Sequence, residues 1–311
     1  LAINGGAAFM LLALMLPAWL AQESRLVFVN YGWLSWLLSL AAVGVALSAA
    51  RDTLAARKLP QLESALAFDL GKHHRLLITG GTGFIGSVLC HALVQGGYQV
   101  TLVSRNPLAA ALQFAGKVRV VRNAAELDAG EIFDVVINLA GAPVVGLPWT
   151  VKRKAVLRAS RLNTPRDLMA FVRRARPAPA VWIQASAIGY YGTHADETVT
   201  EHSPQGQGFA AELCGEWERL TEELDVLGIR RVVLRFGLVF GSSGGSLPIM
   251  LMPFRLGFGS VMGSGDQHIA WIHLEDVLRL IAWSIRTDVS AIINAVAPDC
   301  PGHRNFAENV G

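Results

Sequence analysis

The segment Leu76-Leu77-Ile78-Thr79-Gly80-Gly81-Thr82-Gly83-Phe84-Ile85-Gly86 decides the fold of this chain. Its leading apolar residues predict a short buried strand, and the glycines that follow predict a tight turn. Leu89 and Leu93 then recur at helical spacing, and Gln99–Val103 predicts a second strand. This strand–turn–helix–strand unit of about 30 residues is typical of a dinucleotide-binding βαβ unit.

The glycines of this turn have separate tasks. Gly80 allows the tight turn, Gly83 lets the backbone approach a pyrophosphate, and Gly86 lets the helix pack closely on the strand. The helix N-terminus then presents free N–H groups and the positive end of its dipole to the phosphates. A Rossmann-like fold that has lost its nucleotide is the alternative. We predict cofactor binding by Gly80, Thr82, Gly83, Phe84, Ile85 and Gly86.

The end of the second strand selects between nucleotides. An NAD-binding protein places Asp or Glu there, to bind the ribose 2′-OH. This chain has Ser104-Arg105-Asn106 instead. Arg105 can form a charge-assisted pair with a 2′-phosphate, and Ser104 can donate a hydrogen bond to it. We therefore predict NADP(H) as the cofactor. The alternative is that Arg105 is a solvated surface side chain.

Strands and helices continue to alternate along the chain. Further strands are predicted at 118–121, 133–139, 181–185, 231–235 and 291–295, and helices at 149–161, 164–174 and 209–227. Repeated βα units predict an α/β fold with a doubly wound parallel sheet of the Rossmann type, covered by helices on both faces. Ligands bind beyond the carboxyl ends of such strands. Asn138–Gly141 and Ser186 end two of these strands and therefore belong to the predicted ligand edge.

The first 50 residues differ in composition from the rest. Their only charged side chains are Glu23 and Arg25, which separate an apolar run at 5–22 from an uncharged run at 26–50. A bilayer-spanning helix needs about 20 apolar residues, so we predict one or two transmembrane helices, arranged as a hairpin over 1–50. A buried helical hairpin in a soluble protein is the alternative.

Basic residues follow the apolar runs at positions 51, 57, 58, 72 and 75. The positive-inside tendency therefore predicts that the rest of the chain is cytoplasmic. We expect residues 51–74 to form a linker and residues 75–311 to form the nucleotide-binding domain, held at the membrane by residues 1–50.

The overall composition excludes several classes of protein. Charged residues make up 16% and hydrophobic residues 52%, which excludes a disordered chain. The net charge of +3 is too small for a dedicated nucleic-acid binder, so we expect no nucleic-acid partner. Cys90, Cys214 and Cys300 lie far apart and form neither a CxxC pair nor a disulfide framework. The expected partners are the membrane and a small-molecule substrate, and the oligomeric state is left open.

Several short stretches together carry a family resemblance: 79–86, 103–105, 138–141, 149–161, 186–192, 217–218, 234–241, 253–257 and 271–273. With them, the chain from about Arg75 resembles an extended short-chain dehydrogenase/reductase of the NAD-dependent epimerase/dehydratase superfamily, in its atypical "epimerase family" branch. The resemblance implies that the cofactor is lined by Ser104, Arg105, Leu139, Ala140, Gly141, Arg161 and Val239. It implies a substrate pocket with Phe254, Arg255, Met262 and His268. Such proteins usually continue further, so we expect a partial substrate lobe.

The resemblance also implies a reaction centre, and here the chain departs from the family. Typical members use a Ser, a Tyr that acts as general acid and base, and a Lys in a Tyr-x-x-x-Lys pair. Ser186 fits the first position, but the helix that should carry the pair has Ala210 and Cys214 instead. Tyr190 and Tyr191 are the candidate substitutes, although no cation is evident beside them. Packing of the two rings over the nicotinamide pocket is the alternative.

Two other groups of side chains are weaker candidates. Cys214 is expected to be a small buried hydrophobic residue and not a nucleophile. The segment 194–202 holds His and acidic residues without a fixed helical spacing, so we expect a solvated loop and no metal.

Two functions remain open. The first is hydride transfer by an NADP(H)-dependent oxidoreductase or epimerase-like enzyme, with Ser186, Tyr190 and Tyr191 as its catalytic residues. The second is a non-catalytic NADP(H)-binding sensor or regulatory protein that lacks the Tyr-x-x-x-Lys pair.

Overall fold

The computed structural model of the chain describes residues 69–144, 148–193, 197–242, 244–255, 261 and 264–310. The predicted transmembrane hairpin at 1–50 and most of the linker at 51–74 lie outside the described residues. Within the described ranges, no helix is both long enough and apolar enough to cross a bilayer.

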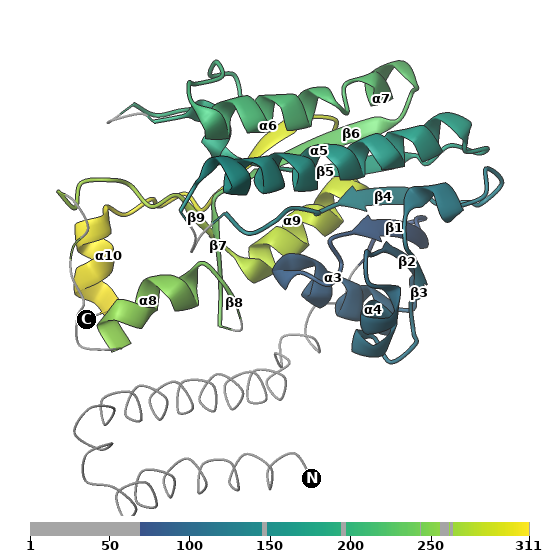
Figure 1. The fold of residues 1–311 in the computed structure, drawn as a ribbon, viewed down its shortest axis with the longest axis horizontal. Helices are drawn as coiled ribbons and strands as arrows, with labels where there is room; N and C mark the ends of the chain where they lie inside the picture. The colour runs from purple at the N-terminus through teal and green to yellow at the C-terminus, as the bar shows by residue number, and fades with distance from the viewer. Residues whose placement is uncertain are drawn as a thin grey trace, which may run out of the picture. The chain divides into compact units, whose positions relative to one another are not determined.

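A parallel sheet of seven strands forms the centre of the fold (Figure 1). Its strands are β1 (Arg75–Thr79), β2 (Gln99–Val103), β3 (Arg119–Val121), β4 (Val135–Asn138), β5 (Val181–Ala187), β6 (Arg230–Phe236) and β10 (Ile292–Ala295). They lie in the order β10-β6-β5-β4-β1-β2-β3, and every neighbouring pair is parallel. The predicted α/β fold and each of its strands are therefore confirmed.

The strands are buried because they are almost continuously apolar. Leu76, Leu77 and Ile78 of β1 are all fully buried, as are Val135 and Ile137 of β4. A parallel sheet is covered on both faces, so its strands need apolar side chains on both sides and not on alternate residues. The uninterrupted apolar runs of the sequence are explained in this way.

Helices cover both faces of the sheet, with α5 and α6 on one face and α3 and α9 on the other (Figure 1). The helices are α3 (Phe84–Gln95), α4 (Pro107–Gln113), α5 (Val151–Arg174), α6 (Phe209–Arg219), α7 (Glu223–Val226), α8 (Leu247–Arg255), α9 (Leu274–Arg286) and α10 (His303–Val310). Short 3-10 turns, η2 (Ala124–Glu126) and η3 (Ile188–Tyr191), follow β3 and β5.

Two helix boundaries differ from the prediction. The helices expected at 149–161 and 164–174 are one helix, α5, which continues through Pro165. Pro165 and its neighbours Leu162 and Leu168 are buried in the core, and this packing offsets the backbone hydrogen bond that a proline removes. The helix expected at 209–227 is instead divided into α6 and α7. The Thr221 hydroxyl donates to the Glu218 carbonyl at 2.8 Å and so helps to end α6.

A second, smaller sheet lies beyond the carboxyl ends of the main strands. It contains β7 (Leu238–Gly241), β8 (Gly244–Gly245) and β9 (Trp271–His273), in the order β8-β7-β9. The Phe84 ring at the start of α3 packs against it, because a Cβ placed on Gly241, Gly244 or Gly245 would lie 2.6–2.8 Å from that ring. The N-terminus of α3 is therefore held between the two sheets.

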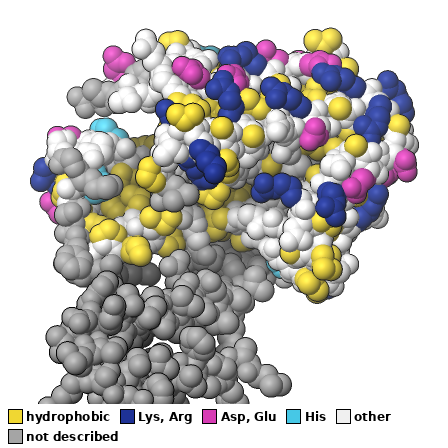
Figure 2. Space-filling model, in the orientation of Figure 1, with side chains coloured by type: hydrophobic (Ala, Val, Ile, Leu, Met, Phe, Trp, Pro, Cys, Tyr) yellow, Lys and Arg dark blue, Asp and Glu magenta, His cyan; other side chains and the backbone are white. Residues whose placement is uncertain are grey.

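Charged side chains of both signs are interspersed over the face that carries α5, α6 and α7 (Figure 2). Arg158 pairs with Glu216 between α5 and α6, and Arg173 pairs with Glu223 between α5 and α7. These partly exposed pairs join neighbouring helices on this face.

Candidate functional site

The glycine-rich turn after β1 has a conformation that other residues cannot easily adopt. Gly80 has a φ of +72°, and a Cβ there would lie 2.5 Å from the Leu139 carbonyl oxygen. A Cβ on Gly86 would lie 2.3 Å from the Gly80 carbonyl oxygen. The tasks predicted for Gly80 and Gly86, a tight turn and close helix packing, agree with this geometry.

The N-terminus of α3 follows this turn, and the N–H groups of its first three residues form no hydrogen bond within the described part of the chain. Its N-cap is Gly83, which has no side chain to accept from the first turn, and no acidic residue lies in that turn. The N–H groups of Phe84, Ile85 and Gly86 therefore lack intrahelical acceptors. Such a terminus attracts an anion through both its N–H groups and its dipole.

The end of β4 is fixed against the glycine-rich turn by a buried polar chain. Asn138 accepts from the Thr79 hydroxyl at 2.6 Å and from the Ala140 N–H at 3.3 Å, and it donates to Gln184 at 3.0 Å. The Leu139 N–H also donates to the Thr79 carbonyl at 3.1 Å. These bonds hold residues 138–140 beside Gly80, at the carboxyl edge of the sheet.

Arg161 of α5 reaches the same edge. Its guanidinium donates to the Ala142 carbonyl at 3.1 Å and lies over the Trp217 ring, 5.2 Å from the centroid. A Cβ on Gly141 would lie 3.3 Å from the guanidinium carbon, so Gly141 allows this approach. Burial lowers the pKa of Arg161. Among the described residues it has no carboxylate partner.

Ser104 and Arg105 follow β2 immediately. Thr79 is the register partner of Val103, so Ser104 lies next to Gly80 across neighbouring strands. The Ser104 N–H donates to the Val121 carbonyl at 2.9 Å, which fixes the start of the loop. Arg105 is exposed, and no hydrogen bond or ion pair joins its side chain to another described residue.

Val239 lies in the second sheet and Phe84 packs against it, and both are predicted cofactor residues. Val239 lies in β7, where it is 9% exposed, two positions before Gly241. Phe84 directs its ring toward β7 and β8, and its backbone N–H belongs to the first turn of α3. Both residues therefore shape the edge by packing.

The carboxyl end of β5 carries a buried charged network that was not predicted from the sequence. Arg235 of β6 forms a forked ion pair with Glu218 of α6, with Nε–Oε1 at 2.9 Å and Nη2–Oε2 at 2.8 Å. The Ser186 hydroxyl donates to the same Glu218 Oε1 at 2.6 Å. Exposure is 1% for Arg235, 6% for Glu218 and 3% for Ser186. The Ser186 hydroxyl therefore donates its hydrogen bond to Glu218.

The two tyrosines of η3 sit on this network in different ways. The Tyr191 hydroxyl accepts from Arg235 Nη1 at 2.8 Å and donates to Asn294 Oδ1 at 2.6 Å, and the residue is 2% exposed. Tyr190 is partly exposed, and its ring centroid lies 3.5 Å from the Arg235 guanidinium carbon. The expectation of no cation beside the tyrosines is wrong, because the cation comes from a distant strand.

Burial and hydrogen bonding change the pKa of Arg235 in opposite directions. Burial alone disfavours its charge, but the bonds to Glu218 and Tyr191 outweigh that effect, so the pKa of the guanidinium is raised. Arg235 is therefore a permanent buried cation beneath Tyr190.

The positions of the missing Tyr-x-x-x-Lys pair face this turn. A Cβ on Gly189 would lie 3.3 Å from the Ala210 Cβ and 3.8 Å from the Cys214 Sγ. Small residues on α6 thus leave room for η3. Burial, followed by the Glu218 charge, raises the pKa of Cys214 to about 11. The expectation that Cys214 is buried is confirmed, because it is 6% exposed, and its lack of a nucleophilic role stays a prediction.

The predicted polar loop is described only in part, since 194–196 lie outside the described residues. The Glu201 carboxylate accepts from the Asn294 N–H at 2.8 Å, and this bond lowers its pKa. The described residues contain no group of three His, Cys, Asp or Glu arranged to hold a metal. His268 contacts the Cys300 carbonyl at 2.9 Å, while Met262 lies outside the described residues.

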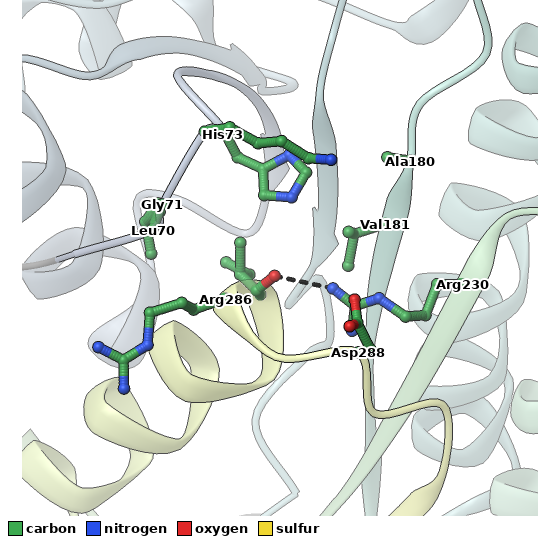
Figure 3. A pocket seen from close by; sticks show the side chains of 10 residues that line it. Leu70, Gly71, His73, Ala180, Val181, Arg230, Arg286 and Asp288 are labelled. Atoms are coloured by element: carbon green, nitrogen blue, oxygen red, sulfur yellow. Dashed lines mark hydrogen bonds between the residues drawn. The ribbon is translucent and has the colours of Figure 1, made fainter.

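A separate cavity of about 360 Å³ opens at the opposite edge of the sheet, where β5 and β6 begin (Figure 3). Two of the cations that line it, Arg230 and Arg286, have partners. Arg230 donates to the carbonyls of Ser284, Ile285 and Val289, all at 2.7 Å, and Arg286 pairs with Asp69 at 3.3 Å. This cavity is distinct from the edge that carries the predicted site residues.

Comparison with known proteins identifies the family. The model of the NAD dependent epimerase/dehydratase family matches residues 76–295. The chain belongs to this family. Epimerase family protein YfhF of Bacillus subtilis is 33% identical over 239 residues, which cover 76% of this chain and 78% of that protein. Human epimerase family protein SDR39U1 is 33% identical over 241 residues, covering 76% of this chain and 79% of that protein.

Solved structures give the same result. The crystal structure of human SDR39U1 with NADPH has a TM-score of 0.65 and 31% identity, covering 76% of this chain and 80% of that chain. A nucleoside-diphosphate sugar epimerase from Corynebacterium glutamicum has a TM-score of 0.65 and 28% identity over 80% of this chain. The chain spans about half, 51%, of that longer protein. These likenesses support a nucleotide-binding, epimerase-like protein.

The carboxyl edge of the main sheet thus combines residues that were predicted from the sequence with residues that were not. The predicted set around Gly80, Ser104, Leu139 and Arg161 comes together at neighbouring strand ends. Sequence reasoning missed the network of Glu218, Arg235 and Asn294. One signal was available for it: Arg235 is a charged residue inside the otherwise apolar run 232–236. A charge within a buried strand requires a partner.

Proposed function

We propose that the chain binds NADP(H) and transfers a hydride between the nicotinamide and a carbonyl or alcohol substrate. The observation that carries the choice of NADP(H) is Arg105, an exposed cation one position beyond Ser104, at a strand end that lacks a carboxylate. A guanidinium matches a 2′-phosphate, while Asp or Glu would match a free ribose hydroxyl. The NADPH-bound structure of the human relative supports the same choice.

The residues present fit a dinucleotide. Gly80 and Gly86 keep the turn free of side-chain atoms, and the uncapped first turn of α3 offers N–H groups to a pyrophosphate. Arg105 would hold the 2′-phosphate, and the turn at Leu139 and Ala140 would line the path toward β5. When bound, the nicotinamide supplies the hydride that reduces a carbonyl carbon or accepts one from an alcohol.

The chain's own reactive groups lie at the end of β5. Ser186 and Tyr191 are already engaged in the buried network, whereas Tyr190 is partly exposed. These residues would position the substrate oxygen and manage its proton. The substrate itself is specified no further than a carbonyl or alcohol.

The first test is a titration of the full chain with NADPH and NADH, followed by nicotinamide fluorescence. Arg105→Ala should weaken NADPH binding by about tenfold or more, which is about 1.4 kcal/mol, and change NADH binding little. Lys117→Ala is the matched control, because it removes one exposed cation at the amino end of β3. Equal or absent binding of both nucleotides by the native chain would refute NADP(H) as the cofactor.

A specific observation favours a second function. Ala210 and Cys214 stand where the family places its Tyr and Lys, so a non-catalytic NADP(H)-binding sensor or regulator also fits the chain. Oxidation of NADPH with a carbonyl substrate would establish the enzyme. Tight binding without oxidation across a broad carbonyl panel would establish the sensor.

We further propose that residues 1–50 anchor the protein in a membrane and that the nucleotide-binding domain is cytoplasmic. The support is the composition alone, with an uncharged run at 26–50 followed by basic residues. Carbonate extraction of cell membranes tests the anchor, and release of the full chain into the supernatant would contradict it.

A further inference from the structure

The structure divides the two candidate tyrosines into different roles. Tyr191 is buried, and its hydroxyl both accepts from Arg235 and donates to Asn294. Its proton is therefore committed inside the protein. Tyr190 is partly exposed, and its hydroxyl forms no hydrogen bond with another described residue. A proton donor must reach its substrate, so Tyr190 is the better candidate of the two.

The cation beneath Tyr190 is held in a fixed orientation. Glu218 binds the guanidinium of Arg235 along its Nε and Nη2 edge, and Tyr191 binds Nη1 at 2.8 Å. Nη1 also approaches the Glu201 carbonyl at 3.4 Å. The flat face of the guanidinium remains for the Tyr190 ring, whose centroid is 3.5 Å away.

This stacking places a fixed cation against the face of the Tyr190 ring. The negative charge of a phenolate spreads into its ring, so a cation over the ring face stabilises the phenolate more than the neutral phenol. The Glu218 carboxylate lies along the guanidinium edge and offsets part of its charge, and the Glu201 carboxylate accepts from the Asn294 N–H at 2.8 Å. A lysine on α6 has the same electrostatic task in typical members of the family.

We propose that Tyr190 is the proton donor of this protein and that Arg235, fixed by Glu218, is a positioning residue that replaces the missing lysine. This inference rests on the proposed hydride-transfer function and assigns its acid. In the reduction direction, the carbonyl carbon gains the hydride and the C=O π bond breaks. The carbonyl oxygen takes the proton from Tyr190 Oη, the Oη–H bond breaks, and solvent water reprotonates Tyr190. The substrate is reduced to an alcohol, and the nicotinamide is oxidised.

The proposed effect of Arg235 on Tyr190 is tested without turnover. The test is nitration with tetranitromethane, which attacks the phenolate form of tyrosine. Tryptic fragments are sequenced by mass spectrometry, and nitration of Tyr190 is expressed relative to Tyr98 in the same sample. In the full chain this ratio should fall at least tenfold in the double variant Glu218→Gln/Arg235→Met. That variant removes both charges together and so avoids an unpaired buried ion. Arg235→Lys keeps a cation and should retain the ratio within about threefold.

A nitration ratio that is the same in the native chain and in Glu218→Gln/Arg235→Met would overturn the role of Arg235. A fall that is equally large in Arg235→Lys would do so as well, because it would show a structural effect and not one of charge. NADPH titration of each variant verifies that the nucleotide-binding edge is intact.

The proposed role of Tyr190 as proton donor is tested with NADPH and phenanthrenequinone as the carbonyl probe. Tyr190→Phe should lower kcat at least a hundredfold and leave the Kd for NADPH within twofold, since the hydroxyl contributes only in the transition state. Equal kcat in the native chain and in Tyr190→Phe would overturn the donor role. A native chain that binds NADPH but reduces no carbonyl probe would refute the hydride-transfer function instead, and the nitration ratio would still decide the coupling of Arg235 to Tyr190.

Discussion

Two neighbouring regions of the same sheet edge are built in opposite ways. The glycine-rich turn between β1 and α3 consists of backbone, and its geometry depends on the absence of side chains at Gly80 and Gly86. The centre at the end of β5 consists of side chains, with a buried ion pair between Glu218 and Arg235. The turn is continuous in sequence, whereas the centre joins β5, α6, β6 and β10. A local motif specifies the first region, and only the complete sheet specifies the second.

The largest expected effect is a loss of stability caused by a substitution in the side-chain region. Glu218→Ala leaves the Arg235 guanidinium buried without a carboxylate and should lower the free energy of unfolding by about 3–5 kcal/mol. Chemical denaturation of the full chain measures this loss. Glu216→Ala is the matched control on the same helix, because the Glu216–Arg158 pair is partly exposed and should contribute about 0–1 kcal/mol. Equal losses of unfolding free energy in the two variants would show that burial of the Glu218–Arg235 pair does not determine its contribution to stability.

The next largest effect is a loss of NADPH affinity caused by a substitution in the backbone region. Gly86→Ala places a Cβ 2.3 Å from the Gly80 carbonyl oxygen, so the turn must shift and NADPH binding should weaken by about a hundredfold, or about 2.7 kcal/mol. Gly97→Ala is the control. Gly97 also has a positive φ, of +81°, but a Cβ there meets nothing within 4 Å. That variant should lose about 1 kcal/mol of stability and retain NADPH affinity. Unchanged NADPH binding in Gly86→Ala would contradict the account of the turn.

The smallest expected effect is the difference in labelling rate between the cysteines of the two regions. Cys90 lies beneath the turn, 3.1 Å from a Cβ placed on Gly81, and Cys214 lies beside η3. Burial raises the pKa of Cys90 to about 12 and that of Cys214 to about 11. Only the thiolate reacts, so iodoacetamide at pH 8 should label the half-buried Cys300 first, then Cys214, and Cys90 last.

Mass spectrometry of the labelled peptides measures this order, and in guanidinium chloride all three cysteines should react alike. Labelling of Cys214 as fast as Cys300 in the folded chain would indicate an accessible thiol beside η3. Cys214 would then have to be considered again as a nucleophile.

Much of the first region was predictable. The glycine spacing, the apolar run before it and the absence of a carboxylate after β2 are local properties, and the parallel register places Ser104 beside Gly80 as expected. Helix boundaries were less predictable. Buried packing carries α5 through Pro165, and Thr221 helps to end α6 early. Both effects depend on neighbours in space.

The sequence by itself determined the α/β class, the strands of the main sheet and the glycine-rich turn after β1, because apolar runs and glycine turns act over a few residues. It also showed that the Tyr-x-x-x-Lys pair is missing. Only the tertiary structure decided what stands beside the tyrosines, since Arg235 is 44 positions beyond Tyr191 and is joined to it at 2.8 Å. A buried charge is stabilised by whichever partners the fold brings within hydrogen-bonding distance, and strand order sets those partners.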